Sequence, residues 1–289
     1  MKNEITIIIL IFEEEFDTIG KCLGSVKDFK IIIVDNTNNI SRKKKILEKF
    51  NIYKYFLNQK NLGFGKGNNI GIENCDTKYL LILNPDCIIS ENTIYALQNT
   101  FEKYPDCFLS TPTLVDENNH LTQNASAFPE ISKIKEPMSI DGDICCQSAL
   151  GAVMFCKTHE LKKLGMFDEN YFIFFEDDDL CKRIRLDKKS VIQIHNVKAF
   201  HQHGQGKSIK NSLKRSFIVN FNMTYSELYY FYKNDNHQEI YKKLKSKIFN
   251  YTIKFFLTLI TLRLNKSIFY LSKILAFFKF KRFLKNNLN

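Results

Sequence analysis

The chain has 289 residues, enough to bury a substantial core in one large α/β domain or two smaller ones, so a disulfide-stapled mini-protein is excluded. With 44% hydrophobic and 25% charged residues, and only 11 Gly and 5 Pro, the composition is that of a folded protein and not of a fibrous or disordered one. The formal net charge of +11 is concentrated at one end: residues 241–289 contain 12 Lys and Arg and no Asp or Glu.

The first part of the chain alternates apolar runs with helical patterns. Residues 5–11 form a short β-branched run, which predicts a strand buried on both faces. Apolar residues at helical spacing follow over residues 16–26, and a second apolar run over residues 30–34 ends in Asp35. A strand, a helix and a strand in this order predict parallel neighbours in one sheet.

The same pattern then repeats up to a third apolar run that ends in Asn84-Pro85-Asp86. Its parts are a helical stretch (41–50), a short apolar piece (53–57), a Gly/Asn-rich segment (58–71) and the apolar run itself (79–83). Ligands of open α/β sheets bind at the carboxyl ends of the strands, so Asp35 and Asp86 are candidates to contact one. Acidic residues at strand ends also serve as turn or helix caps, which is the alternative interpretation.

The later part contains the most informative patch of the sequence. It begins with a strand and polar loop (108–124), a weakly structured region (to 143), a strand (151–155) and a short helix (158–164). Four consecutive carboxylates, Glu176 to Asp179, then follow an aromatic run and precede a helical pattern. Adjacent carboxylates repel each other, so a positive partner is expected. The alternative is an acidic helix N-terminus that interacts with the helix dipole.

These residues could hold a divalent metal ion. Asp86 and the acidic run supply carboxylates, and His201 and His203 supply imidazoles. Mg²⁺ or Mn²⁺ needs only one or two carboxylates when substrate phosphates complete its coordination, so a nucleotide diphosphate is the natural ligand. The Gly/Asn-rich segment could let the backbone approach such a ligand, although it is neither a P-loop nor a Rossmann GxGxxG motif.

Six segments match one known pattern, in the same order along roughly residues 5–210. They are NLGFGKGNNIGI (61–72), LNPD (83–86), GA (151–152), GMFDE (165–169), FEDDDLCKR (175–183) and HGQGKS (203–208). Together they resemble family 2 glycosyltransferases of the rhamnosyltransferase-like branch. The resemblance implies an α/β GT-A fold, with a Rossmann-like, mixed, mostly parallel sheet flanked by helices, and sugar transfer with inversion. It places the catalytic domain at residues 1–215 and leaves a basic amphipathic helical region at 216–289.

The resemblance also implies roles for individual residues. Asp177 would be the catalytic base, with Glu176 and Asp179 assisting it electrostatically or orienting it. Asp86 would face a Mg²⁺ or Mn²⁺ ion together with His203, or with His201 if the register is shifted. The residues implied in binding the nucleotide-sugar donor are Asp35, Asn36, Gly63, Gly65, Asn68, Asn69 and Asn84.

The donor sugar follows from the branch alone, which implies dTDP-rhamnose and a glycan or lipid-linked saccharide acceptor in surface polysaccharide synthesis. After the first strand the family usually has polar nucleotide contacts, whereas this chain has Phe12 followed by Glu13, Glu14 and Glu15. A UDP-sugar donor such as UDP-galactofuranose is therefore an alternative. Another alternative is a GT-A protein that binds carbohydrate or nucleotide but has lost activity.

The basic end of the chain reads as consecutive helices from Phe217 onward. Its longest uncharged run, residues 255–262, is far shorter than the roughly 20 residues that span a bilayer. Basic and apolar residues together predict helices that lie on an anionic membrane surface. A helical extension packed on the catalytic domain is the alternative, and nucleic-acid binding ranks last because no such module is recognisable.

The cysteines and the N-terminus bear on the compartment. The eight cysteines form no CxxC pair and no zinc-type spacing, and most lie in apolar segments, where a thiol behaves as a small hydrophobe. The adjacent Cys145 and Cys146 have no role that the sequence explains. No secretion signal is visible. We therefore expect a cytoplasmic protein with reduced thiols, peripheral on the inner face of the cytoplasmic membrane.

Overall fold

The structure is a computed structural model and describes residues 2–122, 125–126, 142–202, 213–234 and 237–287. Contacts divide the chain into two compact units. The described residues of 1–169 and 176–208 form the sheet unit, and those of 170–175 and 209–289 form the helical unit. The predicted domain boundary between residues 215 and 216 stays a prediction.

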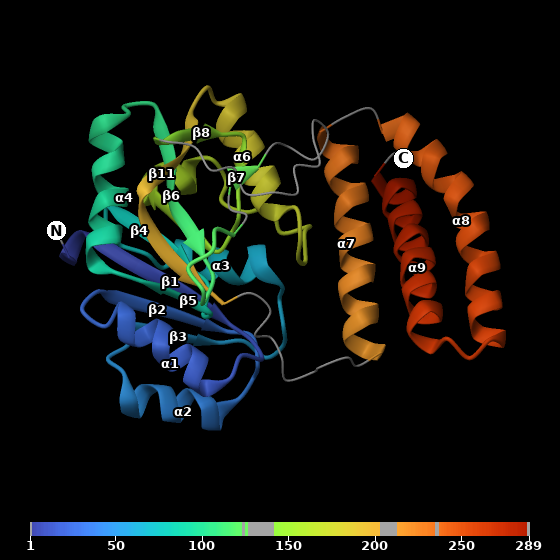
Figure 1. The fold of residues 1–289 in the computed structure, drawn as a ribbon, viewed down its shortest axis with the longest axis horizontal. Helices are drawn as coiled ribbons and strands as arrows, with labels where there is room; N and C mark the ends of the chain where they lie inside the picture. The colour runs from blue at the N-terminus through green and yellow to red at the C-terminus, as the bar shows by residue number, and fades with distance from the viewer. Residues whose placement is uncertain (1, 123–124, 127–141, 203–212, 235–236, 288–289) are drawn as a thin grey trace. The chain divides into compact units, whose positions relative to one another are not determined.

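The sheet unit is built around a mixed, nine-stranded sheet (Figure 1). Its order is β3-β2-β1-β4-β10-β6-β11-β5, and β8 also pairs with β11. The strands are β1 (Ile5–Ile11), β2 (Lys30–Asp35), β3 (Lys54–Leu57), β4 (Tyr79–Leu83), β5 (Cys87–Ile89), β6 (Cys107–Val115), β8 (Ile144–Cys146), β10 (Val153–Lys157) and β11 (Ser190–His201). The first four strands in this order are parallel, as is the pair β6 and β11, and the other pairs are antiparallel. The predicted α/β class is confirmed.

Helices cover both faces of the sheet. The helices on one face are α1 (Phe16–Ser25), α2 (Ile40–Lys49) and α4 (Glu91–Lys103), and those on the other are α3 (Phe64–Glu73), α5 (Thr158–Lys163) and α6 (Glu176–Leu186). The side chains of β1 divide accordingly, because Ile7 and Ile9 belong to the first core and Ile8 to the second. Burial on both faces explains why β1 reads as an unbroken apolar run. Two short elements, β7 (Ala125–Ser126) and β9 (Ser148–Ala149), pair separately, and a 3₁₀ turn (Lys2–Glu4) precedes β1.

The Gly/Asn-rich segment forms the helix α3, which its glycine content alone disfavours. The glycines let α3 approach β1 closely. A Cβ atom at Gly71 would lie 2.4 Å from Cγ2 of Ile8, and one at Gly67 would lie 2.5 Å from Cδ1 of Leu10. Gly63 precedes the helix with a φ of 87°, a left-handed conformation that favours glycine.

The helical unit consists of α7 (Leu213–Asn234), α8 (His237–Ile260) and α9 (Leu264–Asn287), with α9 packed against both of the others (Figure 1). Its core is largely aromatic and includes Tyr225, Tyr230 and Phe280. The aromatic run that precedes the acidic cluster also belongs here: the Tyr171 and Tyr229 rings meet edge to face at 4.9 Å, and Ser226 Oγ donates to the Ile173 carbonyl at 2.9 Å. None of the described helices is both long and apolar enough to span a membrane.

Candidate active site

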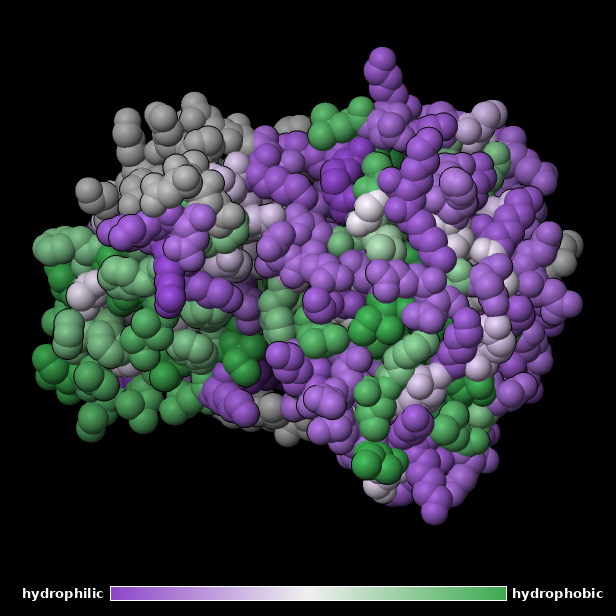
Figure 2. Space-filling model, turned by 180° about the vertical axis from the view of Figure 1, so that it is seen from behind, coloured by the Kyte–Doolittle hydropathy of each residue, from purple (hydrophilic) through white to green (hydrophobic). Residues whose placement is uncertain are grey.

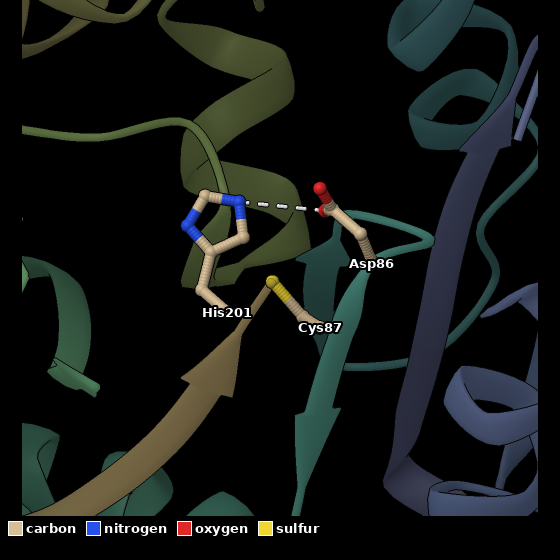
Figure 3. Close-up of side chains that lie close together, drawn as sticks. All are labelled: Asp86, Cys87 and His201. Carbon is tan, nitrogen blue, oxygen red and sulfur yellow. Dashed lines mark ion pairs between the residues drawn. The ribbon is translucent and has the colours of Figure 1, made fainter. Parts of the chain in front are cut away.

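Asp86 and His201 meet at one end of the sheet. The chain leaves β4, passes through Asn84 to Asp86 and enters β5, which pairs antiparallel with the end of β11 so that Cys87 lies opposite His201. The Nε2 atom of His201 lies 3.4 Å from Oδ1 of Asp86 (Figure 3). The two side chains are 7% and 16% exposed, so the imidazole and the carboxylate are largely screened from water.

Cys87 lies beside this pair but is a poor metal ligand. The ligand atoms of Asp86, Cys87 and His201 all lie within 4.8 Å of one another. Burial, with a contribution from the Asp86 charge, raises the pKa of the Cys87 thiol well above its usual range, and a protonated thiol does not bind a metal as a thiolate does. The remaining donors, a carboxylate oxygen and an imidazole nitrogen, fit a Mn²⁺ or Mg²⁺ ion whose other ligands come from phosphates and water.

Among the described residues, His201 is the histidine that lies beside Asp86. The sequence prediction paired Asp86 with His203 and kept His201 as the alternative register. His203 lies outside the described residues, so its part stays a prediction. The strand that carries His201, β11, had no counterpart in the sequence prediction. Its pairing register with β6 shifts between Ile194 and Lys198, which interrupts the regular alternation that identifies a strand in a sequence.

Asp177 lies in the first turn of α6 and is held by backbone groups. Its Oδ2 accepts a hydrogen bond from the Gly151 N–H and its Oδ1 accepts one from the Asp178 N–H, both at 3.0 Å. Burial raises the pKa of Asp177, while these two N–H groups act in the opposite direction. A fixed carboxylate with a raised pKa is a stronger base than a free aspartate and is suited to accept a proton from a hydroxyl.

A short segment connects Asp177 to the loop that carries Asp86. Gly151 donates to Asp177, and the carbonyl of the next residue, Ala152, accepts from the Asn84 N–H at 2.8 Å. A Cβ atom at Gly151 would lie 3.0 Å from Cζ of Phe64, so the backbone approaches here as only glycine allows without displacement. The adjacent residues Gly151 and Ala152 therefore hold both Asp177, the candidate base, and the loop that carries Asp86, the candidate metal ligand.

Glu176 differs from Asp177 although the two are adjacent. It is 5% exposed, and within the described part of the chain its Oε2 has no hydrogen-bond partner. Burial first, and the Asp177 charge second, raise the pKa of Glu176 well above its usual range. Burial thereby favours the protonated form of Glu176, whereas the Gly151 and Asp178 N–H groups favour the charged form of Asp177.

Asp179 makes internal contacts. Its Oδ2 accepts from Arg183 Nε at 2.8 Å, and the Arg183 guanidinium also donates to the Leu164 and Met166 carbonyls at 3.0 and 2.6 Å. The Asp179 side chain is fully buried. This arrangement anchors α6 to the loop at residues 164–166, and Arg183 is the positive partner that the acidic run was expected to need. Asp178 accepts a hydrogen bond from Ser148 Oγ.

Asp35 and Asn36 are buried at the end of β2. Asp35 accepts from the Thr37 N–H at 2.8 Å and from the Tyr55 hydroxyl at 2.6 Å. The Asn36 side chain donates to the Gly63 carbonyl at 3.2 Å, and this holds the loop before α3. Both side chains therefore order their surroundings, and their predicted contact with the nucleotide stays a prediction.

The donor-binding candidates on α3 pack against residues 167–169. Asn69 Nδ2 donates to the Phe167 carbonyl at 2.9 Å and Asn69 Oδ1 accepts from the Phe167 N–H at 3.0 Å. A Cβ atom at Gly65 would lie 3.1 Å from Cβ of Phe167. Asn68 is 1% exposed and donates to the Phe64 carbonyl at 3.1 Å. These contacts explain the residue types by packing, and a role in donor binding stays a prediction.

Glu14, in the turn after β1, was not among the predicted site residues. The Phe12 N–H donates to Glu14 Oε2 at 2.7 Å, and Arg42 donates to the Phe12 carbonyl. Burial raises the pKa of Glu14, and the charge of Asp86 adds to the effect, so the two carboxylates interact. The sequence feature that could have identified Glu14 is the acidic run after the first strand, where the family usually has other polar residues.

Comparison with known proteins identifies the family. The model of glycosyl transferase family 2 matches residues 6–160, more than half of the chain. The chain belongs to glycosyl transferase family 2. This glycosyltransferase is 28% identical over 218 residues to rhamnosyltransferase WbbL of Escherichia coli (strain K12), covering 67% of this chain and 81% of WbbL. It is 24% identical over 212 residues to the low-salt glycan biosynthesis hexosyltransferase Agl10 of Haloferax volcanii, covering 70% of this chain and 68% of Agl10.

Solved glycosyltransferases share the fold. GalNAc-T7, crystallised with UDP, GalNAc and Mn²⁺, superposes with a TM-score of 0.56 at 14% identity, over 79% of this chain and 50% of its own. TarS of S. aureus superposes with a TM-score of 0.51 at 14% identity, over 81% of this chain and 44% of its own. This glycosyltransferase therefore spans about half the length of these two solved chains. The predicted GT-A fold is confirmed.

Proposed function

We propose that this glycosyltransferase transfers a sugar, with inversion, from a nucleotide-diphosphate donor to a hydroxyl of a saccharide or lipid-linked saccharide. The observation that carries the proposal is the Asp177 carboxylate, fixed by the N–H groups of Gly151 and Asp178. One base suffices for a single in-line displacement, and such a displacement inverts the anomeric centre. Family membership supports the reaction class, and the fixed carboxylate supports the choice of base.

In the proposed reaction, the acceptor hydroxyl loses its proton to Asp177 as its oxygen bonds to the anomeric carbon. The bond from that carbon to the diphosphate breaks on the opposite face, and the nucleotide diphosphate leaves with the electron pair. Burial favours the protonated form of Glu176, and in that form it adds no competing negative charge beside Asp177. Asp179 acts through Arg183, which holds α6 and hence Asp177 in place.

We propose that Asp86 and His201 hold the divalent ion, Mg²⁺ or Mn²⁺. When bound, such an ion neutralises the negative charge that develops on a leaving diphosphate. Asp35 and Asn36, by holding Tyr55 and the loop before α3, are proposed to shape the donor pocket together with Gly63, Gly65, Asn68, Asn69 and Asn84.

For the donor we propose dTDP-rhamnose, used in the synthesis of a surface polysaccharide. The similarity to a protein named as a rhamnosyltransferase, WbbL, supports this choice. A UDP-sugar is the second candidate, because the turn after β1 carries Glu14 instead of the family's usual nucleotide contacts. The similarity to Agl10, named as a hexosyltransferase, is compatible with either donor.

Calorimetric titration with dTDP and with UDP, each with and without Mn²⁺, tests the donor site. We expect metal-dependent binding of one nucleotide that is lost in Asp86→Ala and weakened in His201→Ala. Because a catalytically inactive protein could also bind a nucleotide, turnover of the preferred nucleotide sugar is measured in the same preparations. Binding of neither nucleotide would contradict the proposed donors, and binding without turnover for any acceptor would favour the inactive alternative.

We also propose that the helical unit holds the enzyme at an anionic membrane surface, on the inner face of the cytoplasmic membrane, where lipid-linked acceptors reside. The support is the basic sequence of residues 241–289, which contain no acidic residue.

A further inference from the structure

The turn between α8 and α9 exposes an unusual amount of hydrocarbon. Seven large apolar side chains among residues 253–264, which we call the α8–α9 tip, are more than 40% exposed. They are Ile253 (44%), Phe256 (55%), Leu257 (57%), Leu259 (42%), Ile260 (78%), Leu262 (82%) and Leu264 (50%). Figure 2 shows hydrophobic surface gathered over the helical unit, at the left of the view. Contiguous patches of this kind mark interaction sites on soluble surfaces.

Leu262 is the most unusual residue of the tip. Its φ of 53° is left-handed, a conformation that residues other than Gly and Asn rarely adopt. It ends α8 in a Schellman motif, in which the Arg263 N–H donates to the Thr258 carbonyl at 2.8 Å and the Leu262 N–H donates to the Leu259 carbonyl at 3.0 Å. Glycine would fill this position without strain. The leucine adds strain and an exposed apolar side chain, and neither stabilises the isolated protein.

The hydroxyl groups at the tip are bonded internally. Thr258 Oγ1 donates to the Lys254 carbonyl at 2.7 Å, and Thr261 Oγ1 donates to the Leu257 carbonyl at 2.8 Å. Ser267 Oγ, in the first turn of α9, donates to Thr258 Oγ1 at 3.1 Å. These three hydroxyls do not depend on water for a partner. A surface that enters a low-dielectric medium needs such pairing, because an unbonded polar group there is costly.

The charges at the tip have one sign. Lys254, Arg263 and Lys266 are exposed, and the sequence has no Asp or Glu from residue 241 to residue 289. Long basic side chains next to an apolar patch can extend their charged ends toward anionic headgroups while the apolar residues enter the lipid. An apolar partner protein would not require this excess of positive charge.

We propose that the α8–α9 tip inserts into an anionic lipid bilayer, with Leu262 and Ile260 entering the boundary between headgroups and acyl chains. The inference rests on the proposed membrane association and names the element responsible for it. It differs from the sequence prediction of basic helices lying flat on the membrane, because α9 is packed between α7 and α8 and contributes buried Ala276, Phe277 and Phe280 to the interior of the unit.

Tryptophan fluorescence can locate the inserted residues, because the chain contains no tryptophan. We would compare the full-length variants Leu262→Trp, Phe249→Trp and Ile40→Trp, mixed with vesicles of phosphatidylglycerol and phosphatidylcholine that carry brominated acyl chains. Phe249 and Ile40 are matched controls, since they are 71% and 74% exposed. Phe249 also lies on α8, about 16 Å along the helix from Ile260.

We expect a blue shift and strong bromolipid quenching for Leu262→Trp, at least twofold more quenching than for Phe249→Trp, and no effect for Ile40→Trp. Equal quenching at positions 249 and 262 would overturn tip insertion in favour of a helix that lies flat. Vesicle binding without quenching at position 262 would overturn it as well. No vesicle binding by the wild-type chain would overturn the membrane association itself, while nucleotide binding would still test the proposed catalysis.

A second comparison separates insertion from a structural role. Leu262→Gly removes the exposed side chain and relieves the left-handed strain, so we expect unchanged or higher thermal stability together with about tenfold weaker partitioning onto the same vesicles. Ile40→Gly removes a 74% exposed side chain with as many carbons as leucine from α2, and its partitioning is expected to equal that of the wild type. Unchanged partitioning of Leu262→Gly would overturn the proposal.

A blue shift of the Leu262→Trp fluorescence that depends on protein concentration without vesicles would overturn lipid insertion in favour of contact with a second copy of this chain.

Discussion

The two units depart from the usual distribution of residues in opposite directions. The sheet unit buries carboxyl groups, as with the fully buried Asp179 and the 5% exposed Glu176. The helical unit instead exposes hydrocarbon, with Leu262 at 82% and Ile260 at 78%. Buried carboxylates and exposed large apolar patches are the two informative exceptions to the rule that apolar residues lie inside. The proposals above assign a different partner to each unit, a polar donor to the sheet unit and lipid to the helical unit.

The largest expected effect is on catalysis in the sheet unit. Asp177→Asn keeps the size of the side chain but removes the base, so we expect the turnover number to fall about 10²- to 10⁴-fold. Donor affinity, measured by calorimetry, should change little because Asp177 is proposed to act on the acceptor. Asp178→Asn is the neighbouring control and should retain most of the activity. Turnover close to the wild-type rate in Asp177→Asn would exclude Asp177 as the base.

The next effect concerns the charges that the sheet unit buries. Asp179→Asn leaves Arg183 without its carboxylate, and breaking such a buried pair should lower the free energy of unfolding by about 3 kcal/mol. Asp17 and Lys21 provide a matched control, with the same 2.8 Å distance and the same spacing of four residues but side chains that are 78% and 61% exposed. Asp17→Asn should leave the denaturation midpoint unchanged, and equal losses for both variants would contradict the role of burial.

Glycine contacts within the sheet unit offer a smaller test. Gly71→Ala would place a Cβ atom 2.4 Å from Ile8 and should destabilise the protein by about 1–3 kcal/mol through overpacking of β1 and α3. Gly24→Ala is the control on α1, where nothing lies within 4 Å of the added atom, and it should stabilise by up to about 1 kcal/mol. Chemical denaturation measures both changes, and the same sign for both would contradict the packing argument.

The smallest expected effect is the pH dependence due to Glu176. Because the folded-state pKa of Glu176 is raised, the stability it contributes is fully present below its unfolded pKa and is lost as the pH rises toward its folded pKa. Glu176→Gln stays neutral, so its stability relative to the wild type should improve as the pH increases above about 4.5. Denaturant unfolding at several pH values measures this difference. A difference that does not vary with pH would show that Glu176 is charged in the folded protein.

The parts of the fold that the sequence predicted well are those with one simple periodicity. The apolar runs of β1, β2 and β4 were identified because both faces of these strands are buried. The helix α6 was expected after the acidic run for its apolar spacing. The helix α3 was not, because its stability depends on how closely Gly67 and Gly71 approach β1, and that contact is absent from the local sequence.

The candidate site was predictable only in part. Asp86 and Asp177 stand out as carboxylates in motifs at strand or helix ends. The sequence prediction chose His203 as the partner of Asp86 and kept His201 as the alternative, because the register that sets Cys87 opposite His201 depends on the pairing of β11 with β5. Tyr55 gave no signal of its own, since its part depends on its contact with Asp35. Glu14 was visible only as a member of the acidic run after the first strand, and its interaction with Asp86 depends on the fold.

The sequence by itself determined the class of the protein: the apolar runs required an α/β sheet, the motifs indicated a family 2 glycosyltransferase, and the charges placed a basic helical region at the end of the chain. Only the tertiary structure decided that His201 meets Asp86, that Gly151 holds Asp177 and that α9 lies between its neighbours. The physical reason is the sequence distance over which each property is set. Periodicity and charge are local properties of a sequence, whereas pKa values, metal-ligand pairs and exposed patches depend on which distant residues the fold brings together.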